Sequence, residues 1–318
     1  MALPTNLYDT YDTTGIREDL VDVIYNISPE DTPILSAIPR AIAKQTKHEW
    51  QIDSLAAAAT NAVTEGDDAT HDAMTATARK SNFTQIMDKV IVVSGTQSAV
   101  DSAGRADEMA YQIAKKSKEL KKDMELSLSS ATLGQAGNNS TPTARTLGGL
   151  QCWIETNGSA GTNGTLSTGD GTDAPGAGTN RAITEAILKE TIQEVYTAGG
   201  DLDVLVVPPK VKQTISGFVG ASSSNPRMFT SEDKTFGAAI DVYVSDFGNL
   251  QIIPNRIMAG LETCFLLQTD MAAAAYLRDF QVNDLAKTGD SEKKQLLVEF
   301  TLEVRNEKAH GILLDITE

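Results

Sequence analysis

Residues 104–133 restrict the possible folds of this chain more than any other stretch, because they predict one long amphipathic helix. Asp101 or Ser102 can cap its start and Gly134 can end it. About thirty residues at ~1.5 Å each give a rod of roughly 45 Å. Its apolar side chains share one stripe: Ala106, Met109, Ile113, Leu120, Met124, Leu128 and Ala131. A stripe this apolar must be covered, so we expect the helix to lie along a sheet or another surface.

The rest of the same helix is charged from Lys115 to Glu125. We expect these side chains on the solvent side, with local pairs such as Lys121 and Glu125. Such pairs contribute only ~0.2–0.5 kcal/mol each, so the apolar stripe decides how the helix packs.

Size and charge narrow the class of protein. A chain of 318 residues exceeds the usual size of one core, which predicts two lobes. A net charge of −16 argues against tight, nonspecific binding to nucleic acid. Cys152 and Cys264 are far apart and predict two buried thiols rather than a disulfide. The start lacks a basic region followed by an apolar run, so we expect neither a secretory signal nor a membrane span.

Two elements before the long helix cannot hold a core of their own. Residues 1–43 form an arm, with a short amphipathic helix over 17–27 and a new turn at Pro33, which must lie on its own body or on a neighbour. Residues 44–53 and 82–94 read as strands of a ribbon. The 28 or so residues between them are too long for an ordinary hairpin loop, so they are either a projection supported by another subunit or a disordered loop.

The second half of the chain alternates helices and strands. Residues 181–197 predict a helix, 204–207 a buried strand and 208 onward another helix, which together indicate an α/β lobe. Strands also follow at 239–245, 250–254, 263–268, 274–280 and 312–316. Residues 296–304 alternate apolar side chains with Glu299, Thr301 and Glu303, which predicts a half-buried strand. Residues 158–180 are rich in glycine, serine and threonine and predict turns.

No pattern of residues in the sequence indicates a catalytic, cofactor-binding or metal-binding site. The histidines, His48, His71 and His310, lie in different elements without metal-ligand spacing. Asp170 and Asp173 do not fit a calcium loop. Phosphate loops, nucleophile elbows and dinucleotide fingerprints are missing from the sequence. We therefore expect no enzyme activity, no cofactor and no metal.

Eight short stretches occur in order along the chain, at 30–33 (EDTP), 50–53 (WQID), 79–82 (RKSN) leading to 85–86 (QI), 93–96 (VSGT), 122–125 (KDME), 147–150 (LGGL), 245–248 (SDFG) and 286–290 (AKTGD). Together they resemble one branch of the major capsid (major head) proteins of tailed bacteriophages, whose fold is shared with the herpesvirus capsid floor. The resemblance covers nearly the whole chain, and 158–180 matches least well.

This resemblance implies an α+β fold with four named parts. Residues 1–43 would be the N-terminal arm and 44–94 the extended E-loop ribbon. Residues 95–150 and 270–310 would form the P-domain with its spine helix at 104–133. Residues 151–269 and 311–318 would form the A-domain, with 158–180 as a variable insertion.

The resemblance also implies a structural protein that assembles with itself. Hexamers and pentamers would tile an icosahedral head, made in the bacterial host cytoplasm, around DNA that is not bound by sequence. Because no helical scaffolding extension precedes the arm, we expect a separate scaffolding protein, together with a portal and possible decoration proteins. The residues expected at contacts between subunits are Trp50, Glu65, Asp67, Asp68, Arg79, Asn82, Lys287 and Asp290.

Two other kinds of protein stay open at this point. One is a different self-assembling protein: a nanocompartment shell of the same fold, or a phage tail or surface-layer component. The other is an enzyme with an α/β lobe, in which residues 54–81 would be a flap over a pocket.

Overall fold

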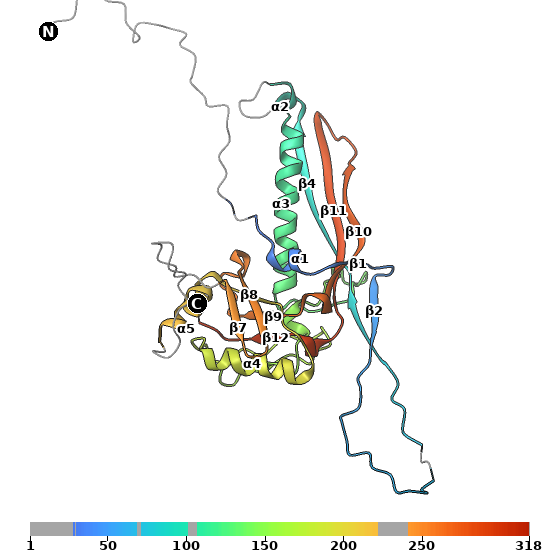
Figure 1. The fold of residues 1–318 in the computed structure, drawn as a ribbon. Helices are drawn as coiled ribbons and strands as arrows, with labels where there is room; N and C mark the ends of the chain where they lie inside the picture. The colour runs from blue at the N-terminus through green and yellow to red at the C-terminus, as the bar shows by residue number, and fades with distance from the viewer. Residues whose placement is uncertain (1–27, 29, 69–70, 101–106, 222–240, 318) are drawn as a thin grey trace, which may run out of the picture.

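A long helix stands beside a four-stranded sheet, and a smaller lobe with a second sheet lies at its base (Figure 1). The computed structural model describes residues 28, 30–68, 71–100, 107–221 and 241–317. The predicted arm helix over 17–27 lies outside the described residues, as do Asp101, Ser102 and Ala106.

The long helix, α3 (Glu108–Ser129), is shorter than predicted at both ends. Asp107 caps it, because its carboxylate accepts hydrogen bonds from the amides of Met109 and Ala110. The helix ends at Ser129 rather than near Gly134, and Ser130 is already extended. The backbone of Gly149 packs so closely there that a Cβ on it would lie 2.1 Å from the carbonyl oxygen of Ser130. This close approach fills the space that another helical turn would need.

The four-stranded sheet has the order β1-β10-β11-β4. Its strands are β1 (Arg40–Ile42), β10 (Ala272–Asp284), β11 (Ser291–Val304) and β4 (Gln85–Ser94). β10 and β11 form a long antiparallel hairpin, β4 pairs antiparallel with β11, and β1 pairs parallel with β10. Leu120, Met124 and Leu128 of α3 share one core with Val298, Phe300 and Leu302 of β11. The predicted packing of the helix stripe along a sheet is therefore confirmed.

Residues 296–302 of β11 are buried on both faces, so the prediction of a half-buried strand over 296–304 is wrong for this part. Glu299 and Thr301, expected in solvent, are both buried. Their face of the sheet is covered at this level by the strands β2 (Lys47–Ile52) and β3 (Ala78–Phe83) and by the loop that carries Arg145. The alternating pattern could not show this, because the cover comes from residues more than a hundred positions away.

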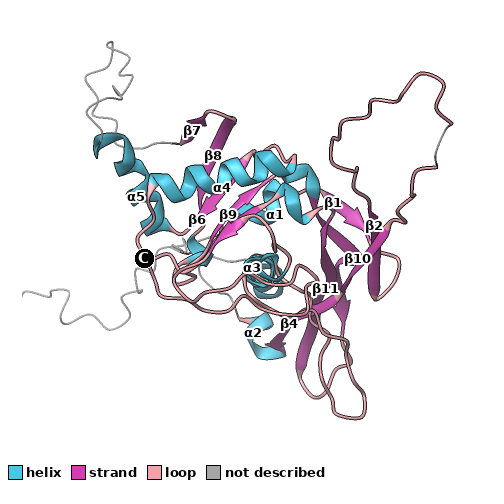
Figure 2. Cartoon of the chain, turned by 90° about the horizontal axis from the view of Figure 1, so that it is seen from below, coloured by secondary structure: helices cyan, strands magenta, loops and turns pink. Residues whose placement is uncertain are grey.

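The smaller lobe contains a mixed sheet of order β5-β12-β9-β6-β8-β7. Two helices, α4 (Glu185–Ala198) and α5 (Pro209–Ala221), belong to this lobe, and Figure 2 shows α4 running across the sheet. The central β6 (Val204–Val207) is buried throughout, with Val204 and Val206 in the core around α3 and Leu205 and Val207 in the core under α4. The predicted α/β lobe is confirmed. The other strands are β5 (Gly158–Ser159), β7 (Val242–Ser245), β8 (Gly248–Pro254), β9 (Cys264–Leu267) and β12 (Gly311–Leu313).

The described end of the arm lies on its own subunit. Helix α1 (Pro33–Ala37) begins at the predicted proline, and Ile34 and Ile38 are buried against α3. The remaining short elements are α2 (Gly95–Ala99) and four 3-10 turns, η1 (Leu150–Cys152), η2 (Arg256–Met258), η3 (Thr269–Met271) and η4 (Glu307–Ala309).

The glycine-rich segment 158–180 is tied to the lobe rather than attached as a simple surface loop. The two carboxylate oxygens of Asp315 accept hydrogen bonds from the amides of Gly161 and Gly178, at 2.8 and 2.9 Å. A Cβ on Gly161 would lie 2.1 Å from the carbonyl oxygen of Thr179, so the close contact requires glycine. The prediction of turns is confirmed, but the interpretation as a mere insertion missed this anchoring.

The two cysteines form no disulfide and both are buried. Burial raises the pKa of the Cys152 thiol to about 12, which leaves it protonated at neutral pH. The expectation of two separate buried thiols is confirmed.

His310 gives the lobe a sensitivity to acid. The side chain is fully buried beside β12, and burial lowers its pKa from 6.5 to about 4. The unfolded chain therefore binds the proton more tightly, so this contribution to stability is present above pH 6.5 and is lost as pH falls towards 4. We expect the free energy of unfolding from this residue to fall by about 2 kcal/mol between pH 7 and pH 5.

Urea unfolding of the wild type and of His310→Gln at both pH values measures this effect. The variant should be less stable at pH 7, with a shallower loss on acidification. Equal pH slopes for the two proteins would show that another group causes the acid sensitivity.

Candidate functional site

The most distinctive surface of the subunit is a ribbon that projects away from both sheets (Figure 1). Its strands, β2 (Lys47–Ile52) and β3 (Ala78–Phe83), pair antiparallel, with His48 opposite Asn82 and Trp50 opposite Lys80. The strand predicted over 82–94 is divided at Thr84, and residues 85–94 belong to the four-stranded sheet instead of the ribbon. The change of sheet occurs where the Thr84 hydroxyl donates to buried Glu299, at 2.8 Å.

Asn82 fastens the base of the ribbon inside the subunit. It is only 2% exposed. Its amide nitrogen donates to the carbonyl oxygens of Gly148 and Leu302, at 3.1 and 2.8 Å. Its amide oxygen accepts from the backbone nitrogens of Phe83 and Gly148, at 2.9 and 2.8 Å. Asn82, predicted at a contact between subunits, is thus buried inside its own chain, which uses its full hydrogen-bonding capacity.

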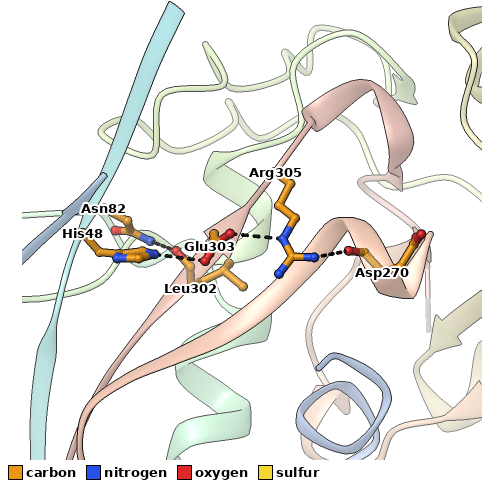
Figure 3. A network of polar contacts seen from close by, with 6 residues as sticks. All are labelled: His48, Asn82, Asp270, Leu302, Glu303 and Arg305. Atoms are coloured by element: carbon orange, nitrogen blue, oxygen red, sulfur yellow. Dashed lines mark hydrogen bonds and ion pairs between the residues drawn. The ribbon is translucent and has the colours of Figure 1, made fainter. Parts of the chain in front are cut away.

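A second fastening lies beside the first, between the ribbon and the end of β11 (Figure 3). His48 Nε2 lies 3.0 Å from a carboxylate oxygen of Glu303. Arg305 Nε donates to the other oxygen at 3.1 Å, and Arg305 also donates to the carbonyl oxygen of Asp270. The hydrogen bond with His48, followed by the one with Arg305, holds the pKa of Glu303 below its ordinary value. The carboxylate stays charged and links β2 to β11.

Aromatic packing completes the base. Trp50 stacks at a tilt on Trp153, with ring centroids 5.3 Å apart, and the Lys80 ammonium donates to the carbonyl oxygen of Gly169. Trp50 was predicted at a subunit contact, and the structure places it half-buried against its own chain. Arg79 is on the opposite face of the ribbon, exposed and 3.5 Å from Glu49.

The buried carboxylate of Glu299 also stabilises the base of the ribbon. Glu299 accepts from Arg145 at 2.5 Å and from Arg278 at 2.8 Å, besides the Thr84 hydroxyl. Two arginines and a hydroxyl satisfy the charge, which a buried carboxylate needs. No local signal in the sequence distinguished Glu299 from the other glutamates of this strand, because Arg145 and Arg278 come from other parts of the chain.

The outer part of the ribbon contrasts with this tightly bonded base. Residues 53–77 form no strand where described, and the carboxylates of Glu65, Asp67 and Asp68 are exposed around a turn at Gly66. Leu55 is 99% exposed and Met74 100% exposed. Between residues 54 and 78 the sequence has four acidic side chains and neither lysine nor arginine. The tip is therefore acidic, with apolar side chains that its own subunit leaves uncovered.

The two other predicted contact residues lie at the opposite end of the subunit. Lys287 and Asp290 are exposed in the turn between β10 and β11, which reaches the far end of α3 (Figure 1). Asp290 packs on Gly95, where a Cβ would lie 2.1 Å from its carboxylate. The structure thus separates the predicted residues into the ribbon base, the ribbon tip and this distant turn.

The described residues contain no arrangement typical of a catalytic or metal site. His48, His71 and His310 do not meet, and within the described ranges no three His, Cys, Asp or Glu side chains could share a metal ion. None of the described helices is both long and apolar enough to cross a membrane. The most prominent feature of the described structure is a projecting ribbon on a tightly hydrogen-bonded base. This arrangement suits contacts with other molecules rather than catalysis.

Comparison with known proteins also indicates a structural protein. The family model described as the SU10 major capsid protein matches residues 4–317. The chain belongs to the SU10 major capsid protein family. The major capsid protein of Escherichia phage Phieco32 is 30% identical over 98% of this chain and 97% of its own length.

Solved structures share the fold over nearly the whole chain. The cyanophage A-1(L) capsid subunit covers 99% of this chain and all of its own, with a TM-score of 0.69 and 17% identity. The encapsulin SrpI of Synechococcus elongatus covers 94% of this chain and 92% of its own, with a TM-score of 0.57 and 11% identity. At these identities the likeness shows the fold alone, and membership of the SU10 family is what separates a capsid protein from a nanocompartment shell. The protein is a structural phage capsid protein and not an enzyme with a flap.

Proposed function

We propose that copies of this chain form hexamers and pentamers that tile an icosahedral head, with the ribbon of each copy lying on a neighbour. The observation that carries this is the uncovered outer ribbon on a firmly bonded base. A two-stranded ribbon with exposed Leu55, Val63 and Met74 is not stable alone, so its geometry favours support from a second copy. Fixing the base keeps the tip at a defined position while contacts form.

The acidic tip directs it towards a cationic surface of the neighbour. Glu65, Asp67 and Asp68 face solvent, whereas α3 exposes a row of lysines that includes Lys115 and Lys118. Opposite charges of this kind set the register of a contact and speed encounter more than they add affinity. Arg79, Lys287 and Asp290 are further exposed candidates for contacts between copies, and Trp50 contributes by stiffening the base.

The four parts named from the sequence keep their proposed roles: N-terminal arm, E-loop ribbon, P-domain around α3, and A-domain lobe at the capsomer centre. The head would be made in the cytoplasm of a bacterial host with a scaffolding protein and a portal, and decoration proteins are further candidate partners. The net charge of −16 favours enclosing DNA without binding its sequence, because an acidic wall repels phosphate.

Negative-stain microscopy of the chain, expressed alone and together with the genes next to it, tests the proposal. Head-sized shells or rings of capsomers are the expected result. Small thin-walled spheres would indicate a nanocompartment, tubes would indicate a tail component, and monomers under every condition would contradict self-assembly.

A further inference from the structure

A fully buried carboxylate, Glu125 of α3, lies where the arm, the long helix and the smaller lobe meet. Its Oε1 accepts from the amide of Ile34 at 2.8 Å and from the side-chain amide of Asn255 at 2.6 Å. Its Oε2 accepts from the amide of Leu35 at 2.8 Å. Glu125 was predicted on the exposed charged side of the helix, paired with Lys121, and that prediction is wrong. The arm and the lobe cover this part of α3.

On the arm side, Glu125 replaces a local helix cap. Helix α1 begins at Pro33, which has no amide hydrogen, and the side chain of Thr32 makes no capping hydrogen bond. The first free amides of α1, those of Ile34 and Leu35, therefore depend on a carboxylate some ninety positions further along the chain. Without Glu125 these buried donors would have no described partner.

On the lobe side, Asn255 is held by the six-stranded sheet. It directly follows β8, its backbone amide donates to the carbonyl oxygen of Val207 in β6, and its side-chain oxygen accepts from the amide of Ile257. Asn255 is fully buried, so its side-chain amide has a fixed direction. The position of the sheet therefore determines where Glu125 receives this third hydrogen bond.

The chemistry of the contact requires a charged carboxylate. All three partners are donors, and a protonated carboxyl would direct its own hydrogen at one of them. Burial raises the pKa of Glu125, while the amides of Leu35 and Ile34 and the side chain of Asn255 oppose that rise. Each of the three donors is therefore needed to hold the charge in place.

We propose that Glu125 and Asn255 form a joint that sets the direction of the arm from the position of the lobe. Both are positioning residues: they are fully buried within one chain, and together they transmit a shift of the six-stranded sheet to helix α1. The coupling is a property of one subunit. Its consequence for assembly, that the arm and the lobe move together, rests on the proposed function.

The substitution Asn255→Asp separates this joint from ordinary stabilisation, because the described hydrogen bonds connect Asn255 to α1 only through Glu125. Aspartate keeps the oxygen that caps Ile257 but replaces the donor with a second carboxylate beside Glu125. Hydrogen exchange of a peptide covering residues 31–38 should become about tenfold faster, although the substitution is in the lobe. Val195→Ala, which removes buried side chain from the core under α4, is the matched control for loss of stability and should leave this peptide unchanged.

A double variant tests whether the signal passes through the contact itself. In Glu125→Gln with Asn255→Asp, the new amide can donate to the new carboxylate, which restores one hydrogen bond with donor and acceptor exchanged. We expect exchange of 31–38 in the double variant to be slower than the two single effects combined. Strict additivity, no change in Asn255→Asp, or an equal change in Val195→Ala would overturn the joint.

Particle formation by the same variants is a separate measurement, which tests the proposed function and not the joint. If the wild type forms no particles, the proposed function fails while the exchange data still decide on the joint.

Discussion

Deleting residues 56–76 is expected to abolish particle formation while leaving the subunit folded. The deleted residues form no strand and are exposed where described, so their loss removes almost no packing from the core. Residues 53–55 and 77 would then close the ribbon between the paired Ile52 and Ala78, which is an ordinary hairpin length. The subunit loses only the part that has no partner of its own. Particle yield by sedimentation and microscopy, beside far-UV circular dichroism and thermal unfolding, measures both halves of this expectation.

A milder variant separates the role of charge from the loss of chain. Glu65→Lys, Asp67→Lys and Asp68→Lys together keep the ribbon at full length but reverse the charge of its tip. We expect particle yield to fall and to recover partly at high salt, because exposed charges are screened. Normal particles from the deletion would show that the outer ribbon is dispensable and would refute its proposed role.

Replacing Asn82 with alanine is expected to lower the free energy of unfolding by about 3 kcal/mol, since four backbone groups lose a partner at a buried site. These groups are the amide and carbonyl of Gly148, the carbonyl of Leu302 and the amide of Phe83. Urea unfolding monitored by tryptophan fluorescence is suitable, because Trp50 and Trp153 stack beside this site.

The matched control is Arg79→Ala, three positions before Asn82 on the opposite face of the same ribbon. Its side chain is exposed and makes one long ion pair with Glu49, so we expect a change within about 0.5 kcal/mol. Asn82→Ala should also reduce particle yield, because the ribbon would leave its base at a less defined angle. A loss of stability no larger than that of the control would mean that the base of the ribbon relaxes and finds other partners.

Local pattern was sufficient for most helices and strands. The apolar stripe of α3, the turn at Pro33 and the buried strand β6 follow from periodicity and from proline chemistry. Each of these signals is carried by neighbours within a few residues.

The polar side chains were the ones misjudged, and for a common reason. Glu125, Glu299 and Asn82 were expected in solvent or at a neighbour, and all three are buried and hydrogen-bonded inside the subunit. For Asn82 the sequence did contain a usable signal, namely its position on the same face of the ribbon as His48 and Trp50. A polar residue on a covered face must find hydrogen-bond partners. Glu125 and Glu299 carried none, since their partners come from other segments of the chain.

The linear chain thus determined most of the helices and strands and the protruding ribbon, because these depend on local spacing and composition. Only the tertiary structure decided where strand 82–94 divides, where α3 ends and which carboxylates are buried. Those features depend on distant backbone: Gly149 against Ser130, Thr84 against Glu299, and Ile34 with Asn255 around Glu125. A charged residue looks the same in the sequence whether water or three donors from elsewhere in the fold surround it.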